Sequence, residues 1–122
     1  MKDFRDLKVR EKSHHLALLV YKHTESFHEQ EMFSLTNQMR WAAVSIPSKI
    51  ARGGGRGGNL ELARFTRVAM GSAGELEYLL RISAELGFLS RVDYKELELA
   101  TTEVKRMLAS LIAKINAEHR KV

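Results

Sequence analysis

The sequence predicts an all-α protein whose four helices pack as a single up-down-up-down bundle. Apolar residues recur at alternating steps of three and four in four separate stretches, which is the spacing of helices packed lengthwise on one another. No comparable stretch alternates with a period of two, so strands are not expected. With 122 residues, no cysteine and one proline, the chain fits one domain over 1–122 without disulfides. We expect helices over about 6–27, 34–52, 59–86 and 90–119.

The first two helices are predicted mainly from their apolar series. The first series is the least regular, because it includes polar members; its positions are Val9, Ser13, Leu16, Val20, His23 and Phe27. The second series is Leu35, Met39, Ala42, Ile46 and Ile50. Ser34 precedes the second series and belongs to a residue type that favours the N-cap, so it is the expected start of that helix.

The third and fourth helices have end signals in addition to their spacing. The third series is Phe65, Ala69, Ser72, Leu76, Leu79, Ser83 and Leu86. The fourth is Tyr94, Leu97, Thr101, Val104, Leu108, Leu111 and Ile115. Gly58 or Asn59 suits the start of the third helix, and Gly87 suits the left-handed position after its end. Ser90, followed by Asp93 three residues later, is the expected cap of the fourth helix.

Small residues gather in the middle of the second and third helices. They are Ala42, Ala43, Ser45, Ala69, Gly71, Ser72, Ala73 and Gly74. Each interior glycine costs about 1 kcal/mol relative to alanine, so a compensating contact is expected. The simplest interpretation is close packing between these two helices. A contact between subunits and room for a ligand are the alternatives.

Further apolar residues lie outside the four series. Leu18, Leu19 and Tyr21 widen the apolar stripe of the first helix, and Trp41 and Val44 widen that of the second. One bundle cannot bury every side of a helix, and a residual exposed apolar patch usually marks an interface. We therefore expect a homo-oligomer.

Charge is concentrated in one part of the sequence. The chain has 20 Lys and Arg against 15 Asp and Glu. The excess lies entirely within residues 40–67, where Glu61 is the one acid and the basic residues are Arg40, Lys49, Arg52, Arg56, Arg64 and Arg67. We expect these six side chains to gather near one end of the bundle and to contact nucleic-acid phosphates. The glycine-rich link over 52–59 would add exposed backbone N–H groups.

Other interpretations of this segment remain open. The link has no Gly-Lys-Ser/Thr sequence, so it is not a Walker A loop, and glycine runs are commonly flexible connectors. The arginines can instead pair with carboxylates of a neighbouring subunit. Trp41 is the one candidate surface for base stacking near the cluster. The sequence therefore favours contacts to phosphates over recognition of bases.

The sequence offers no constellation for catalysis or metal binding. The five histidines do not form a His-Glu-x-x-His pattern. A di-iron bundle needs Glu-x-x-His pairs on two helices, whereas Glu25 and His28 have this spacing near the end of the first helix and the later helices do not repeat it. We expect no enzyme activity, no metal and no cofactor. No apolar run approaches the length of a membrane span, and the start of the chain lacks a signal-peptide core, so a cytoplasmic protein without membrane contact is expected.

Two motifs give the chain a family resemblance. They are Ala-Ala-Val-Ser-Ile-Pro-Ser over 42–48 and Gly-Ser-Ala-Gly-Glu-Leu-Glu over 71–77, supported by Leu-Gly-Phe-Leu over 86–89. With them, the chain resembles the four helix bundle protein family encoded within intervening sequences of 23S ribosomal RNA genes. The resemblance implies a four-helix bundle and a homopentamer. Related accessory proteins of diversity-generating retroelements bind a reverse transcriptase and nucleic acid.

The chain departs from the family pattern where its charge is highest. Lys-Ile-Ala-Arg-Gly over 49–53 replaces the usual Asn-Ile-Ala-Glu-Gly, so Arg52 stands in place of an acid. Arg10 and Gly54 each stand where the family usually has an aromatic residue. These changes raise the positive charge and strengthen the expectation of a polyanion partner. Taken with the other observations, we expect a non-enzymatic, homo-oligomeric protein that binds RNA or DNA through phosphates. The alternative is a scaffold for a protein such as a reverse transcriptase, with no nucleic-acid role.

Overall fold

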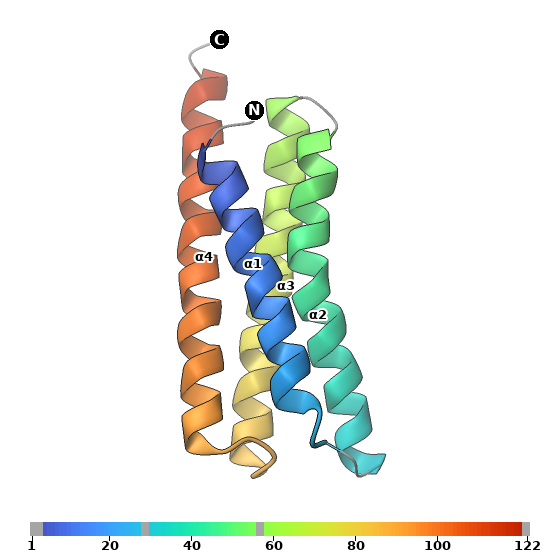
Figure 1. The fold of residues 1–122 in the computed structure, drawn as a ribbon. Helices are drawn as coiled ribbons and strands as arrows, with labels where there is room; N and C mark the ends of the chain where they lie inside the picture. The colour runs from blue at the N-terminus through green and yellow to red at the C-terminus, as the bar shows by residue number, and fades with distance from the viewer. Residues whose placement is uncertain (1–3, 28–29, 56–57, 121–122) are drawn as a thin grey trace.

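Four helices make up the computed structural model of this chain, which describes residues 4–27, 30–55 and 58–120. They are α1 (Phe4–Thr24), α2 (Gln30–Gly55), α3 (Asn59–Glu85) and α4 (Arg91–Arg120). Each helix runs antiparallel to the one before it, so α1 and α3 begin, and α2 and α4 end, at the same end of the bundle (Figure 1). The predicted all-α four-helix bundle is confirmed, with boundaries within a few residues of those expected.

The predicted apolar series form the core. On α4, every member from Leu97 to Ile115 is buried, and Tyr94 packs against the core at the start of the helix. Leu16, Met39 and Leu76 bring α1, α2 and α3 to the same core with almost no exposed surface. Burial of one such side chain contributes about 1.5–3 kcal/mol to folding. The two polar members of the first series are accommodated in different ways: Ser13 Oγ donates to the Arg10 carbonyl of its own helix at 3.1 Å, whereas His23 contacts carboxylates of α4.

The turn from α3 to α4 follows its sequence signals. Gly87 has a φ of +83°, the left-handed conformation that glycine adopts without strain. Ser90 caps α4, since its Oγ accepts a hydrogen bond from the Asp93 backbone N–H at 3.1 Å. At the other end of α3, Gly58 occupies the N-cap in an extended conformation. These caps place both ends of the α3–α4 hairpin where the sequence predicts them.

Helix α2 is longer than expected at both ends. It begins at Gln30, so Ser34 is an interior residue rather than the predicted cap, and its Oγ accepts a hydrogen bond from Gln38 Nε2 at 3.2 Å. At the other end, α2 continues past Arg52 to Gly55. Gly53 and Gly54 are buried within this last turn. Tertiary burial therefore overrides the low helix propensity of glycine.

The close approach of α2 and α3 occurs at Gly53 and not at the mid-helix glycines. A Cβ added at Gly53 would lie 2.9 Å from Phe65 Cβ and 3.3 Å from Leu62 Cα. A Cβ at Gly71 or Gly74 would meet nothing within 4 Å. The prediction that these two glycines permit close helix packing is therefore wrong. In the middle of the bundle, the small residues Ala42, Ala43, Ala69 and Ala73 are buried instead, and Ser72 Oγ of α3 donates a hydrogen bond to Ser45 Oγ of α2 at 3.0 Å.

Candidate nucleic-acid interface

One end of the bundle collects most of the positive charge. Because the helices alternate in direction, this basic end consists of residues 4–14, 45–55, 58–70 and 106–120 (Figure 1). These segments contain eleven Lys and Arg against four Asp and Glu. The described residues outside them contain six basic and nine acidic residues. The bundle is thus positive at the end where α1 begins and α4 ends, and negative at the other.

The structure places four of the six predicted phosphate contacts at the basic end. Lys49 and Arg52 lie on the last turns of α2, and Arg64 and Arg67 lie on the first turns of α3. All but Lys49 are exposed. Arg56 falls outside the described residues. The four described side chains therefore border the link between the two helices, as predicted.

Arg40 lies apart from this group, contrary to the expectation that all six would gather together. It is twelve residues before Arg52 on the same helix, which is about 18 Å along the helix axis. Its guanidinium contacts α1, where it lies 4.5 Å from the centre of the Tyr21 ring. Arg40 thus belongs to a different surface from the basic end.

The contacts of the basic end leave much of its charge uncompensated. Arg64 pairs with Glu61 at 3.2 Å, and the hydrogen bond and charge of that carboxylate raise the pKa of Arg64. Arg67 Nη2 donates to the Asn116 side-chain oxygen at 3.2 Å, which carries no charge. Arg10, Lys49, Arg52 and Arg67 form no ion pair with any side chain that the structure describes. Four cations from α1, α2 and α3 therefore remain available to an anion.

The ring of Phe65 contacts the guanidinium groups of both Arg52 and Arg64. This buried ring lies 4.4 Å from the Arg64 guanidinium carbon and 5.7 Å from that of Arg52. Both distances fall within the range of cation–π contacts, which are worth about 0.5–1 kcal/mol at exposed sites. The ring thereby brings a cation from α2 and a cation from α3 to the same place.

Ion pairs are more frequent in the opposite half. Arg81, Lys95 and Lys105 pair there with Glu85, Glu98 and Glu77 at 2.9–3.2 Å. His23 lies between two further carboxylates, with Nε2 2.7 Å from Glu96 Oε1. The two halves therefore differ both in net charge and in how far their cations are neutralised.

Sequence reasoning missed the part of the basic end that comes from α1 and α4. Arg10 lines a shallow hollow with Pro47 and Ala51 of α2, which places it beside the last turns of that helix. Arg120 ends α4 at the same end of the bundle. These residues lie far from 40–67 in sequence, where local charge balances. The predicted up-down-up-down topology could have identified these residues, because it brings the starts of α1 and α3 and the ends of α2 and α4 to one end of the bundle.

The glycines of the link do not play the predicted role throughout. Gly53 and Gly54 lie within α2 and are buried, so their backbone N–H groups belong to the helix and are not presented to a phosphate. Gly57, like Arg56, falls outside the described residues. In the described part of this segment, the exposed guanidinium groups are the donors that can form hydrogen bonds to an anion.

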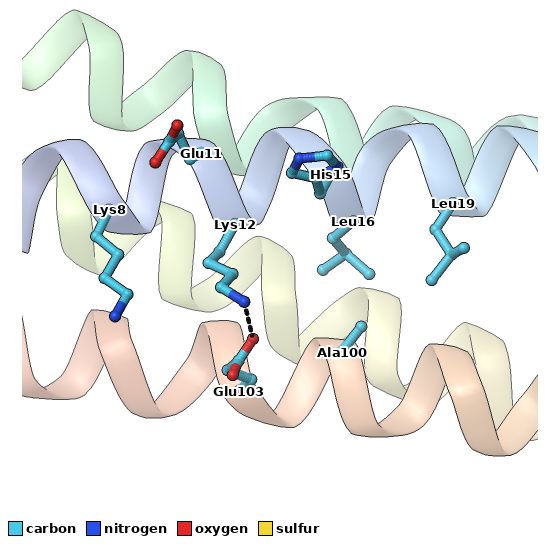
Figure 2. A pocket seen from close by; sticks show the side chains of 8 residues that line it. All are labelled: Lys8, Glu11, Lys12, His15, Leu16, Leu19, Ala100 and Glu103. Atoms are coloured by element: carbon cyan, nitrogen blue, oxygen red, sulfur yellow. Dashed lines mark ion pairs between the residues drawn. The ribbon is translucent and has the colours of Figure 1, made fainter.

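A separate hollow between α1 and α4 offers no catalytic arrangement. Its volume is about 420 Å³, and it is lined by Lys8, Glu11, Lys12, His15, Leu16, Leu19, Ala100 and Glu103. Figure 2 shows Lys12 pointing toward Glu103, with which it pairs at 3.2 Å, while Glu11 and His15 point away from α4. The charges of Lys12 and Glu103 therefore compensate each other between α1 and α4, and the His15 ring takes no part in this ion pair.

The described residues contain neither a metal-binding cluster nor a helix that could span a membrane. Over residues 4–27, 30–55 and 58–120, no three His, Asp or Glu side chains are placed to hold a metal ion together. None of the helices in that part of the chain combines the length and the apolar character needed to cross a bilayer.

The comparison with known proteins agrees with this architecture. The family model described as 23S rRNA-intervening sequence protein matches residues 5–110. The chain belongs to this family. A crystal structure of a protein of unknown function from the S23 ribosomal protein family of Bacteroides thetaiotaomicron has the same fold, with a TM-score of 0.82 and 23% sequence identity. The similarity covers 90% of this chain and 99% of that one, and no curated protein matches the sequence.

Proposed function

We propose that this member of the 23S rRNA-intervening sequence protein family is a non-enzymatic protein that binds RNA or DNA through backbone phosphates. The observation that carries the proposal is the basic end, where four helix ends contribute eleven basic residues against four acidic ones. Lys49 and Arg52 are its central contacts, with Arg10, Arg64 and Arg67 around them. Arg56 adjoins them in sequence.

At the basic end, the mechanism is neutralisation of phosphates without recognition of bases. Each contact between a cation and a phosphate releases condensed counterions, so affinity falls as salt rises. The Arg52 guanidinium lies 5.7 Å from the centre of the Phe65 ring and pairs with no carboxylate among the described side chains. Arginine also has a planar fork of donors that suits phosphate oxygens. The contacts are therefore independent of sequence.

Charge reversal at the basic end tests this proposal. In the Lys49→Glu/Arg52→Glu double variant, we expect binding of a labelled single-stranded RNA to weaken at least about tenfold at low salt. The slope of log K against log salt should fall by about 1.4, since each phosphate contact to a single strand contributes about 0.7. Fluorescence anisotropy over a salt series measures both quantities.

A matched variant controls for net charge. Lys22→Glu/Arg91→Glu changes the charge by the same amount at the opposite half of the bundle, on exposed side chains of α1 and α4. We expect it to retain the wild-type salt slope. Equal losses in the two double variants, or wild-type binding that does not vary with salt, would contradict the proposal.

The alternative function is a protein-interaction scaffold, for example for a reverse transcriptase. It is favoured by large apolar side chains that the single chain leaves exposed, namely Leu18, Tyr21, Phe33, Trp41, Val44, Leu60, Val68, Tyr78, Leu86, Val92 and Leu99. Apolar and aromatic contacts would then supply the binding energy. A pull-down from the source cells with and without nuclease separates the two functions. Partners held through nucleic acid are released by the nuclease, whereas partners held by direct contact remain.

A further inference from the structure

A hollow on the side of the bundle lies apart from the basic end and joins aromatic, cationic and amide groups. Its volume is about 400 Å³, and it is lined by Tyr21, Asn37, Gln38, Arg40 and Trp41. Tyr21 comes from the second half of α1, and the other four residues come from the first half of α2. Small-molecule sites have volumes of about 300–1,000 Å³, so the hollow is large enough for one nucleoside.

Arg40 is held in a fixed position within this hollow. Its Nε donates a hydrogen bond to Thr24 Oγ1 at 2.9 Å, and its Nη2 donates to the Tyr21 carbonyl at 3.4 Å. Thr24 is buried and is itself anchored, because its Oγ1 donates to the Val20 carbonyl at 2.8 Å. The guanidinium also lies 4.5 Å from the Tyr21 ring centre. α1 therefore holds the guanidinium in place without a carboxylate among the described side chains.

Trp41 adds a large aromatic surface beside this arginine. It is the single tryptophan of the chain, and 81% of it is exposed. Its exposure is the highest among the large apolar side chains that the structure describes. An indole in this position gains nothing from the core of its own subunit. Its ring faces are available to stack on another planar group.

Two carboxamides complete the lining. Gln38 Nε2 donates to Ser34 Oγ at 3.2 Å, which orients that side chain on α2. Asn37 forms no hydrogen bond or ion pair with the side chains that the structure describes, and it is exposed. Carboxamides carry a donor and an acceptor side by side, the pattern that pairs with the edge of a base.

We propose that this hollow binds an unpaired base of a single-stranded nucleic acid. Single-stranded bases stack on aromatic rings and on arginine planes and form hydrogen bonds through their exposed edges. Trp41, Arg40 and the Asn37 and Gln38 amides provide these three elements. A base inside a duplex has both faces covered by its neighbours and cannot enter. The inference rests on the proposed function and makes it more specific, since it selects single strands over duplexes.

The hollow and the basic end are placed to bind the same strand. Both lie on α2, where Trp41 and Arg52 are eleven residues apart, which is about 16 Å along the axis. Single-strand sites commonly span about 4–16 nucleotides, so one strand reaches both surfaces. Phosphates would then contact Lys49 and Arg52 while a base occupies the hollow. Arg40 thereby acts as a stacking platform rather than as one more phosphate contact.

Intrinsic fluorescence of Trp41 tests the inference directly, because no other tryptophan contributes to the signal. The probes are an oligouridylate of about 12 nucleotides, a duplex of equal length, and a strand of equal length in which abasic units replace the nucleosides. We expect the oligouridylate to quench Trp41, and the duplex and the abasic strand to bind through phosphates without comparable quenching.

Variants measured by anisotropy provide a second readout. Stacking of one base contributes about 1–3 kcal/mol, so Trp41→Ala should weaken oligouridylate binding roughly 5- to 150-fold and leave its salt slope unchanged. Trp41→Phe keeps an aromatic face and should restore part of the affinity. Tyr78→Ala removes another exposed aromatic ring, on α3, and should bind as the wild type does.

Three results would overturn the inference. Salt-dependent binding without quenching, and with no effect of Trp41→Ala, removes the base site and leaves the phosphate interface intact. No binding of any probe at low salt removes both proposals. A lower solution mass for Trp41→Ala than for the wild type would assign Trp41 to a contact between copies of the chain.

Discussion

Gly53 lies too close to α3 to accommodate a side chain without a shift of the helices. In Gly53→Ala, the new methyl group would lie 2.9 Å from Phe65 Cβ, and neither atom can move without shifting α2 or α3. Overpacking of this kind costs about 1–3 kcal/mol, and the higher helix propensity of alanine returns about 1 kcal/mol. We expect a net loss of stability in urea unfolding. Phe65 should also shift relative to Arg52 and Arg64.

Gly71→Ala and Gly74→Ala are the matched controls for this prediction. Both positions lie inside α3 and have no atom within 4 Å of an added Cβ, so only the gain in helix propensity applies. Each should raise the free energy of unfolding by about 1 kcal/mol. Gly53→Ala should therefore be less stable than either control by about 1–3 kcal/mol. Three variants of equal stability would show that α2 and α3 do not approach closely at Gly53.

Tyr94 gives the bundle a pH dependence in alkali. Partial burial raises the pKa of its hydroxyl above the ordinary value of 10.0, and the Glu98 carboxylate, which accepts its hydrogen bond at 3.2 Å, raises it further. Above about pH 10 the unfolded chain releases this proton more readily than the folded chain does, so folding stability falls as pH rises. Below that pH the residue adds no pH dependence. Tyr94→Phe should flatten the fall in stability measured by urea unfolding from about pH 8 to 11.

Lysines also titrate in this range, so the difference between variants is the quantity to compare. Tyr78→Phe is the control, because its ring is exposed on α3. It should follow the wild-type curve. At neutral pH, Tyr94→Phe should be less stable by about 0.5–1.5 kcal/mol, since it loses one hydrogen bond. Parallel alkaline curves for Tyr94→Phe and the wild type would contradict this account.

At the scale of the helices, local signals predicted α3 and α4 better than α2. Gly87 and Ser90 act through their own backbone and side chain, so their roles are readable from a few neighbouring residues. The start of α2 lacks such a signal, and Ser34 proved to be an interior residue. The end of α2 depends on the burial of Gly53 against α3. This contact joins residues of two helices that come together only on folding. The errors therefore fall where tertiary contacts override local preference.

The attachment of α1 to α4 shows the same dependence on folding. His23 belongs to the predicted apolar series of α1, yet its ring lies between two carboxylates of α4, with Nδ1 3.5 Å from Asp93 and Nε2 2.7 Å from Glu96. The acids lie seventy residues or more away in the sequence, so no local pattern joins them to His23. The apolar spacing predicted that His23 lies on the inner face of α1, but it did not predict that Asp93 and Glu96 are its partners.

For the whole molecule, the decisive property is the separation of charge along the bundle. The excess of cations within 40–67 was visible in the sequence, and four of the six residues predicted there border the link between α2 and α3. The basic residues that α1 and α4 add to the basic end follow from the topology of the bundle. The position of Arg40 away from the basic end follows from it as well. A bundle with one positive end is attracted to a polyanion in a preferred orientation. Assembly of several copies with these ends together would increase that attraction.

We therefore expect assembly of several copies to strengthen binding to a polyanion. We expect a solution mass that is a multiple of 13.9 kDa, consistent with the pentamer that the family resemblance implies. An oligomer that presents several basic ends should bind a long single strand about 10²- to 10⁴-fold more tightly than a strand that reaches only one of them. Light scattering gives the mass, and anisotropy with strands of graded length gives the affinities.

Dilution distinguishes this linkage from a simple effect of strand length. Below the concentration at which the oligomer dissociates, the advantage of the long strand should fall toward the small statistical factor of a single site. The short strand should keep its affinity throughout, because one basic end suffices for it. A mass of 13.9 kDa at every concentration, together with an undiminished preference for the long strand, would place all contacts within one copy and leave assembly without a role in binding.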